Sequence, residues 1–371
     1  MRRPIDDLPE HRSRVRGCLL GGALGDALGA PVEFDSLGEI RRQYGPAGLT
    51  EPAPDLLGRV GLITDDTQMT LFTVEGLIRG DDVTAVRRAY LRWLDTQQHP
   101  SPPPADGGFR TGRLREQRWL YSQRAPGNAC LSGLRHREAV APARFGEPGP
   151  VNPGSKGCGT VMRSAPFGLR ARSARHAFEL AAECAQITHG HPTGYLAAGA
   201  FAAVVHYLTE AGTPEDGTPE REEPLARAVR KAMDLLSAYP SHQETTEALR
   251  AAVSLAAEGA PSPERVESLG GAWIAEEALA IAVYCALVNP GPHDVRQALL
   301  LAVNHSGDSD STGAVCGNLL GALHGEAALP RDWLAHLEGR DAITGLADDF
   351  AAQSADGHEA TGGWLTKYPE D

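Results

Sequence analysis

The longest apolar segments of this chain are rich in alanine and show no alternation of polar and apolar residues. YLAAGAFAAVVHYL (195–208) and AWIAEEALAIAVYCALV (272–288) are apolar on nearly every face of a helix. Helices of this kind are buried among other helices, whereas a half-buried strand alternates apolar and polar residues. Convincing strand patterns are almost absent elsewhere in the chain. The sequence therefore predicts an all-α, multi-helix protein.

Alanine and leucine also recur at helical spacing in other segments. We expect helices over residues 13–30, 67–79, 83–97, 173–187, 193–210, 224–237, 243–258, 273–288, 294–303 and 313–324. Stretches rich in proline and glycine predict loops at residues 99–108, 143–157, 209–224 (an acidic stretch) and 258–265. No repeat and no hinge between separately patterned halves is visible. We therefore expect one domain over residues 1–371, with a core at about 13–326 and a tail at 350–371.

The charge and the apolar pattern exclude several classes of protein. The net charge of −13 repels nucleic acid, although one small anion pocket remains compatible with it. No apolar run reaches the ~18 residues that a membrane span needs, and we see no secretion signal. The six cysteines contain no C-x-x-C pair, which disfavours a zinc knuckle or a disulfide framework. We expect a cytoplasmic protein that binds neither nucleic acid nor membrane.

One candidate site is the segment GLITDDTQMTLFTVEGL (61–77), where Asp65 and Asp66 stand between Thr64 and Thr67 just before a predicted helix. One acidic residue is enough to cap a helix N-terminus. Two adjacent carboxylates repel each other unless a cation or a proton offsets their charge. Helix capping and cation binding both remain open for this pair.

A second acidic cluster, SGDSDSTG (306–313), also precedes a predicted helix. Asp308 and Asp310 alternate with Ser309 and Ser311, but the twelfth position of an EF-hand loop would be Leu319 instead of glutamate, which excludes that motif. Carboxylates and hydroxyls are ligands for Mg²⁺ or Mn²⁺, and a capped turn is the alternative. The two clusters lie about 240 residues apart. If they converge, four carboxylates surround one or two divalent cations.

Glycine recurs at every fourth residue from Gly17 to Gly29, so one face of the first helix has no side chains. Such a stripe predicts close packing of two helices, which offsets the roughly 1 kcal/mol that each helical glycine costs. Asp26 and Glu33 stand at or just past the end of this helix. A carboxylate is unfavourable there unless it has a partner. Pro31 ends the helix, and we expect Glu33 to lie on a mobile loop at the mouth of a cleft.

Two further segments suggest a site for an anionic ligand. The glycine-rich turn at 157–160 can present backbone N–H groups to a phosphate, with Arg163 nearby. An ion pair that serves only the fold is an equal interpretation of Arg163. His189 and His191 precede a helix without the further ligands of a zinc site, so a hydrogen bond from histidine to a ligand is the favoured interpretation.

Together these segments resemble the ADP-ribosylglycohydrolase family, which includes dinitrogenase-reductase-activating glycohydrolase and ADP-ribosylarginine hydrolase. The resemblance runs from about Val15 to Gly325. Its motifs are GDALGAPVEF (25–34), TDDTQM (64–69), RAPGNACLSGL (124–134), KGCGTVMR (156–163), THGHPTGY (188–195), GAWIAEEALAIA (271–282) and SGDSDSTGA (306–314). Each motif alone is weak, but seven in this order are specific.

The resemblance implies an orthogonal helix bundle that holds two Mg²⁺ or Mn²⁺ ions in a cleft. The implied metal ligands are Thr64, Asp65, Asp66, Asp308, Asp310 and Ser311. The implied catalytic residues are Asp65, Asp66 and Glu33, the last of which moves when substrate binds. The implied contacts to ADP-ribose are Gly157, Cys158, Gly159, Thr160, Arg163, His189, Ser306 and Gly307. Cys158 stands where several relatives have asparagine, so one polar contact to a ribose is in question.

The resemblance also implies the reaction, which is hydrolysis at the anomeric carbon of ADP-ribose. We expect release of ADP-ribose from modified arginine, because an acidic cleft suits a cationic leaving group. Alternatives are an O-linked ADP-ribose on serine or on a small metabolite, and an inactive relative that only binds ADP-ribose. A binuclear phosphoesterase or amidohydrolase is disfavoured, because the chain lacks strands and a histidine set near the aspartates.

Overall fold

The computed structural model describes residues 8–55, 57–105, 108–136, 140–210, 223–356 and 362–369. Its longer helices are α1 (Leu8–Gly29), α2 (Leu37–Tyr44), α3 (Asp65–Arg79), α4 (Val83–Gln98), α7 (Ala174–Ala185), α8 (Pro192–Thr209), α9 (Pro224–Leu236), α10 (Gln243–Ala256), α12 (Ala275–Leu287), α13 (Val295–Val303), α14 (Ser309–His324) and α16 (Arg340–Asp356). Its shorter helices are α5 (Asn128–Leu134), α6 (Ala165–Arg170), α11 (Pro263–Glu267), α15 (Arg331–Leu334) and α17 (Gly362–Lys367).

The all-α prediction is confirmed. In the described ranges the only β-type pairing outside the helices is an isolated bridge between Gly157 and Ile274. Each expected helix is present, with its ends shifted by a few residues. None of the helices that the structure describes is long and apolar enough to span a bilayer.

The sequence analysis missed several helices, of which α16 is the longest. The segment at 350–371 that it set apart as a tail begins inside this helix, where Ile343, Ala347 and Phe350 are buried. Arg16 of α1 binds Asp348 of α16 with two hydrogen bonds of 2.6 Å. The hydrophobic core therefore extends beyond the expected end near residue 326. Most of the acidic stretch at 209–224 lies outside the described residues.

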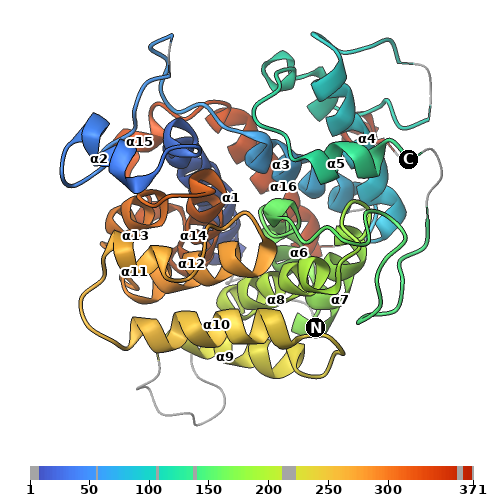
Figure 1. The fold of residues 1–371 in the computed structure, drawn as a ribbon. Helices are drawn as coiled ribbons and strands as arrows, with labels where there is room; N and C mark the ends of the chain where they lie inside the picture. The colour runs from blue at the N-terminus through green and yellow to red at the C-terminus, as the bar shows by residue number, and fades with distance from the viewer. Residues whose placement is uncertain are drawn as a thin grey trace.

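Helices α1 and α14 lie side by side at the centre of the molecule (Figure 1). A Cβ atom added at Gly25 would lie 1.9 Å from the carbonyl oxygen of Gly313, and one at Gly21 would lie 2.4 Å from that of Gly317. The two backbones thus touch along a stripe of glycines on both helices, as the four-residue spacing in α1 predicted. The helices run antiparallel, so the C-terminal end of α1 meets the N-terminal end of α14.

Two further helices form the apolar interior beside this pair. Every residue of α8 is buried except Tyr207, and α12 is buried except at Glu277 and Leu287. Helices α7, α9 and α12 pack on α8, and α10 and α14 pack on α12. In Figure 1, α9 and α10 close the lower edge of the bundle, and α3 and α16 lie on the other side of α1 from α13. Complete burial explains why both segments lack a polar face.

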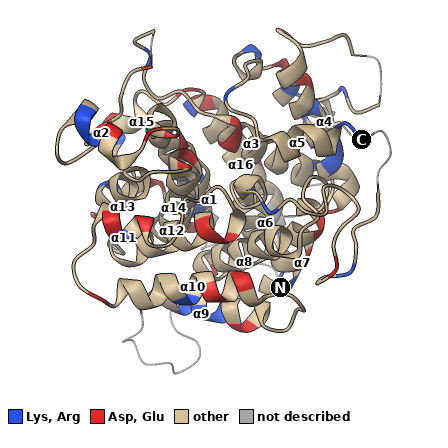
Figure 2. Cartoon of the chain, in the orientation of Figure 1, with Lys and Arg blue, Asp and Glu red and all other residues tan. Residues whose placement is uncertain are grey.

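Charged residues are distributed over many helices, and red and blue segments are interspersed in the view of Figure 2. Several form ion pairs at the surface, such as Arg296 with Asp332 at 2.7 Å. Exposed pairs of this kind contribute about 0–1 kcal/mol each. The fold therefore depends on its apolar interior and on the glycine contact.

Candidate functional site

The start of α3 is held by an aspartate from another helix. Both carboxylate oxygens of Asp26, in the last turn of α1, accept hydrogen bonds from the backbone N–H of Thr64 at 3.0 Å. Asp26 also accepts from the backbone N–H of Thr67 at 3.1 Å and from its hydroxyl. This is the partner that a carboxylate near a helix C-terminus needs. The sequence analysis noted that need but assigned Asp26 no role.

Asp26 and Thr64 accept hydrogen bonds from the backbone N–H groups at the start of α3. The carboxylates of Asp65 and Asp66 are therefore not needed to cap this helix. Thr64 is the N-cap residue, and its hydroxyl accepts from the backbone N–H of Asp66 at 3.2 Å. Burial raises the pKa of Asp26 to about 6, and the hydrogen bonds from the two threonines oppose this rise. The tandem aspartates of α3 are thus available for another purpose.

The loop before α5 fixes Asp65. The backbone N–H of Asp65 donates to the carbonyl of Arg124, and its carboxylate accepts from the backbone N–H of Gly127, both at 3.3 Å. The Arg124 guanidinium binds Glu338 and donates to the carbonyl of Ile63 at 2.7 Å. Between these contacts Ala125 has a φ of 55°, in the left-handed region. A non-glycine residue adopts that region at a cost, which is common near functional sites.

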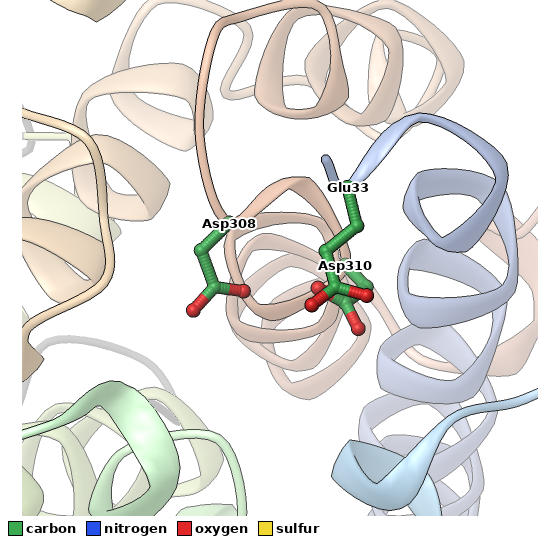
Figure 3. A group of neighbouring side chains, drawn as sticks. All are labelled: Glu33, Asp308 and Asp310. Carbon is green, nitrogen blue, oxygen red and sulfur yellow. The ribbon is translucent and has the colours of Figure 1, made fainter. Parts of the chain in front are cut away.

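The second acidic cluster forms the start of α14. Asp308 caps this helix, and the backbone N–H of Ser311 donates to Asp308 at 3.3 Å and to Asp310 at 3.0 Å. Glu33, just past the 3₁₀ turn that follows α1, points toward Asp310 (Figure 3). One carboxylate oxygen from each of Glu33, Asp308 and Asp310 lies within 4.8 Å of the others. All three side chains are buried.

The two clusters lie next to each other, because α3 and α14 are in contact and the charge of Asp308 acts on both Asp65 and Asp66. Burial, followed by the charges of neighbouring carboxylates, raises the pKa of Asp65 and of Asp66 well above its ordinary value. The same two causes raise the pKa of Glu33 to about 9. Burial and the charges of nearby carboxylates also raise the pKa of Asp310 well above its ordinary value. Buried carboxylates this close together repel each other unless protons or cations offset their charges.

One atom of the site tests whether a cation fits. The Oδ2 atom of Asp66 is buried and has no hydrogen-bond partner among the described residues. A buried acceptor without a partner costs about 1–3 kcal/mol, and more when it is charged. The surrounding donors are carboxylate and hydroxyl oxygens, which are the ligands that Mg²⁺ and Mn²⁺ prefer. The residues present therefore fit a divalent cation.

The glycine-rich turn and His189 lie against each other. A Cβ atom added at Gly157 would lie 3.3 Å from His189 Nε2, and one at Gly159 would lie 3.2 Å from His189 Cε1. Cys158, between them, has its thiol beside Asp308 and Ser311. The turn therefore connects the acidic site to His189. Thr160 lies beneath the turn, and its hydroxyl donates to the carbonyl of Gly194 at 2.7 Å.

Hydrogen bonds connect His189 to Arg163 through Thr188. Arg163 donates to the hydroxyl of Thr188 at 2.6 Å, and that hydroxyl lies 2.7 Å from His189 Nδ1. Burial, and then the charge of Arg163, lowers the pKa of His189 to about 3, so the imidazole is neutral near pH 7. The Thr188 hydroxyl also lies 3.4 Å from the carbonyl oxygen of Ala185, so either this hydroxyl or Nδ1 can be the donor between them, while Nε2 faces the turn. The sequence analysis did not identify Thr188.

Arg163 itself lies behind His189 and is fully buried. Its guanidinium contacts the Sγ atom of Cys130 at 3.3 Å and stands 4.6 Å above the centre of the Tyr90 ring. None of its contacts with the described residues is with a carboxylate, so the structure does not support the ion-pair interpretation of Arg163. Thr188 and His189 connect Arg163 to the glycine-rich turn.

Ser306 and Gly307 belong to the turn before Asp308 and have partners within the fold. The hydroxyl of Ser306 accepts from the backbone N–H of Leu37 at 2.8 Å and donates to Glu267 at 2.5 Å. A Cβ atom added at Gly307 would lie 2.2 Å from the carbonyl oxygen of Gly271. Glycine at this position lets the backbone N–H of Asp308 donate to the same oxygen at 3.0 Å. Both residues thus position Asp308.

The sequence profile of the family described as ADP-ribosylglycohydrolase matches residues 7–359. The chain belongs to the ADP-ribosylglycohydrolase family. This confirms the resemblance to a family of ADP-ribosyl hydrolases.

Curated relatives cover nearly the whole chain. An ADP-ribosyl-[dinitrogen reductase] glycohydrolase from Rhodospirillum rubrum is 28% identical over 89% of this chain and 92% of its own length. The ADP-ribosylhydrolase ARH3 of Mus musculus is 26% identical, over 91% of each chain. An ADP-ribosylarginine hydrolase, Tri1 of Serratia proteamaculans, is 24% identical over 92% of this chain and 81% of its own.

A solved structure described as an ADP-ribosylglycohydrolase-related protein complex has the same fold. It matches with a TM-score of 0.64 and 25% identity, over 93% of this chain and 99% of that chain. The all-α arrangement around the two acidic clusters is thus the fold of this family.

Proposed function

We propose that this ADP-ribosylglycohydrolase uses two divalent cations, Mg²⁺ or Mn²⁺, to release ADP-ribose from modified protein by cleaving the N-glycosidic bond to arginine. The observation that carries the proposal is the meeting of the two acidic clusters around the unpartnered oxygen of Asp66. Four buried aspartates, which the fold brings together from opposite parts of the chain, have no purpose in stability alone. Family membership supports the ADP-ribose chemistry.

The cations would be held by Thr64, Asp65 and Asp66 from α3 and by Asp308, Asp310 and Ser311 from α14. When bound, divalent cations orient the ribose hydroxyls and withdraw electron density from them. Glu33 borders the same set of oxygens and closes the site on the side of α1. Asp26 positions the α3 ligands without being one itself.

The chain's own residues supply the proton transfers and the binding of the rest of the substrate. A water molecule attacks the anomeric carbon and loses a proton to Asp65 or Asp66. The bond from carbon to the guanidine nitrogen breaks and a bond from carbon to the water oxygen forms. The proton that the aspartate took from the water then passes to the departing guanidine nitrogen, so that the leaving group departs as guanidinium. Paired carboxylates suit the oxocarbenium-like transition state of such a cleavage.

The diphosphate of the substrate would lie along the Gly157–Thr160 turn. Backbone N–H groups of the turn donate to its oxygens, and glycines at 157 and 159 permit close approach of the ligand. His189 is neutral near pH 7, and its Nε2 atom, which faces the turn, is a donor for a diphosphate or ribose oxygen when it carries the proton. A neutral donor suits this place, because the acidic clusters lie next to it.

The arginine linkage follows from charge. Guanidine departs most easily as a cation, and the leaving group would emerge beside Glu33, Asp308 and Asp310. The similarity to an ADP-ribosylarginine hydrolase supports the same linkage. Serine-linked ADP-ribose has a leaving group without a charge and would gain nothing from these carboxylates.

Cation binding and linkage can be tested in one experimental series. We expect calorimetry to show two Mn²⁺ ions bound to the wild type and to the control Asp332→Asn, whose carboxylate is exposed. Asp66→Asn and Asp310→Asn should lose at least one ion and all turnover while keeping the helical circular dichroism spectrum. Unfolding of both site variants would instead favour a capping role for the clusters.

The linkage test compares arginine-linked and serine-linked ADP-ribose on peptides, with Mg²⁺ and with Mn²⁺ at one pH. We expect faster release from arginine. Faster release from serine or from a small O-linked metabolite would overturn the arginine assignment while keeping the cation site. Binding of ADP-ribose without release from any substrate would show a protein that only binds it.

A further inference from the structure

Two aromatic side chains are exposed on the surface and stack on each other. The ring centres of Phe34 and Trp273 lie 5.9 Å apart, with 19° between the ring planes. Their exposed fractions are 72% and 47%, and the other large apolar side chains that are exposed in the described ranges are aliphatic. Single exposed apolar residues are ordinary, but a stacked pair of rings offers a flat binding face.

The pair borders the acidic site from two separate segments. Phe34 directly follows Glu33, whose carboxylate belongs to the group formed with Asp308 and Asp310. The carbonyl of Trp273 accepts from the backbone N–H of Cys158 at 3.2 Å. Two residues before Trp273, the carbonyl of Gly271 accepts from the backbone N–H of Asp308 at 3.0 Å. Hydrogen bonds therefore tie the aromatic pair to both the acidic site and the glycine-rich turn.

The indole of Trp273 is held in place by its own segment. A Cβ atom added at Gly271 would lie 3.2 Å from Trp273 Cδ1 and 3.5 Å from Nε1. The indole thus rests over the backbone of Gly271, with Phe34 stacked against it. A ring that is both exposed and fixed binds a flat ligand at a low cost in conformational entropy.

The chemistry of these surroundings favours a planar cation. Aromatic faces attract guanidinium groups through cation–π contact and stacking, worth ~0.5–2 kcal/mol. Glu33, which directly precedes Phe34 and is not one of the proposed cation ligands, adds a carboxylate that attracts a positive charge and repels a phosphate. A guanidinium matches both features, whereas the hydroxyl of serine matches neither.

We propose that Phe34 and Trp273 hold the guanidino group of the modified arginine and so determine the linkage that this enzyme cleaves. This inference rests on the proposed function, because the arginine is attached to the ribose that the cation site binds. Phe34 adjoins Glu33 at the end of the site where the anomeric carbon would lie. The adenine, across the diphosphate from that carbon, would lie farther from Glu33.

The test compares Phe34→Ala, Trp273→Ala and Trp273→Phe with wild type on arginine-linked and serine-linked substrates of the same peptide. We expect the ratio of kcat/KM values, arginine over serine, to fall about tenfold in each alanine variant, and Trp273→Phe to keep most of it. Val253→Ala, an exposed apolar residue of α10, is the control and should not change the ratio.

A binding measurement separates this inference from activity. With ADP-ribose and Mn²⁺ present, agmatine should quench the fluorescence of wild type and should not quench that of Trp273→Phe. The affinity for ADP-ribose itself should stay unchanged in all three variants. Circular dichroism spectra matching wild type show that the variants are folded.

Three results would overturn the inference. An unchanged ratio in both alanine variants would show that the pair does not select the linkage. An equal loss on both substrates would show a general role. A loss of ADP-ribose affinity would place the adenine on the rings instead. Failure of the proposed function differs from all three, because it would appear in wild type itself, which would release ADP-ribose faster from serine than from arginine or from neither substrate.

Discussion

The contact between α1 and α14 makes Gly25→Ala a sharp test of how the fold builds the site. The added Cβ would lie 1.9 Å from the carbonyl oxygen of Gly313 and 2.3 Å from its carbonyl carbon. Real Cβ atoms essentially never come within 3.0 Å of such an atom, so the two backbones must separate by about 1.1 Å. No side chain can rotate to relieve this clash, because both sides of the contact are backbone.

The size of the effect follows from two opposing contributions. Alanine in a helix interior stabilises by about 1 kcal/mol relative to glycine. Overpacking of a well-packed interior costs about 1–3 kcal/mol. A gap of 0.5–1 Å between α1 and α14 would also remove roughly a quarter to a half of the dispersion energy of each contact between them. We take the upper end for a backbone clash and expect a net loss of about 2 kcal/mol. The separation also moves Asp26, and with it the start of α3 that Asp26 holds, away from the start of α14. The proposed ligands on the two helices would then lie farther apart, so the affinity for Mn²⁺ should fall.

Urea unfolding in the presence of EDTA measures the stability, and calorimetry measures Mn²⁺ binding. The control is Gly345→Ala in α16, where an added Cβ meets no heavy atom within 4 Å and should stabilise by about 0.5–1 kcal/mol. Gly21→Ala makes a similar clash farther from the acidic residues and should destabilise with a smaller loss of Mn²⁺ affinity. If Gly25→Ala were as stable as wild type, α1 and α14 would be packed more loosely than the structure implies, and this reasoning would be refuted.

Three further predictions concern charge in the interior. Asp66→Asn should raise the melting temperature in EDTA, since it removes one of several repelling carboxylates, and should abolish the further rise that Mn²⁺ gives to wild type; a lower melting temperature in EDTA would contradict this. Metal-free stability should fall as the pH rises from about 4 to about 9, because burial and the charge of Asp308 raise the pKa of Glu33 to about 9 in the folded state, which keeps a proton that the unfolded chain releases. Melting curves in EDTA at pH 5.5 and 8 test this, and higher stability at pH 8 would reverse the sign. Arg92→Met should destabilise by about 3 kcal/mol in urea, because it leaves buried Glu75 without the partner that donates to it at 2.8 Å; the double variant with Glu75→Gln should recover part of the loss, and equal loss in both would argue that packing alone matters.

The sequence alone determined ten of the helices and the position of both acidic clusters at helix starts. Helical spacing of alanine and leucine is a local property, so the positions of α8 and α12 could be predicted without knowing what packs on them. TDDT and DSDS stand before apolar helices, which places both clusters at helix starts. The glycine spacing in α1 predicted a close helix contact, and the same four-residue spacing from Gly313 to Gly321 was a signal for its partner.

Only the tertiary structure decided which distant residues meet. Asp26 needed a partner, but its identity, the start of α3, depends on how α1 and α3 cross. The sequence left open whether Arg163 contacts a ligand or forms an ion pair. In the structure Arg163 is buried behind Thr188 and supports His189 through it. Phe34 and Trp273 lie 239 positions apart along the chain, and only the tertiary structure stacks them on each other. The physical reason is that helix propensity acts within one turn, whereas charge pairing and burial act between segments that only packing brings together.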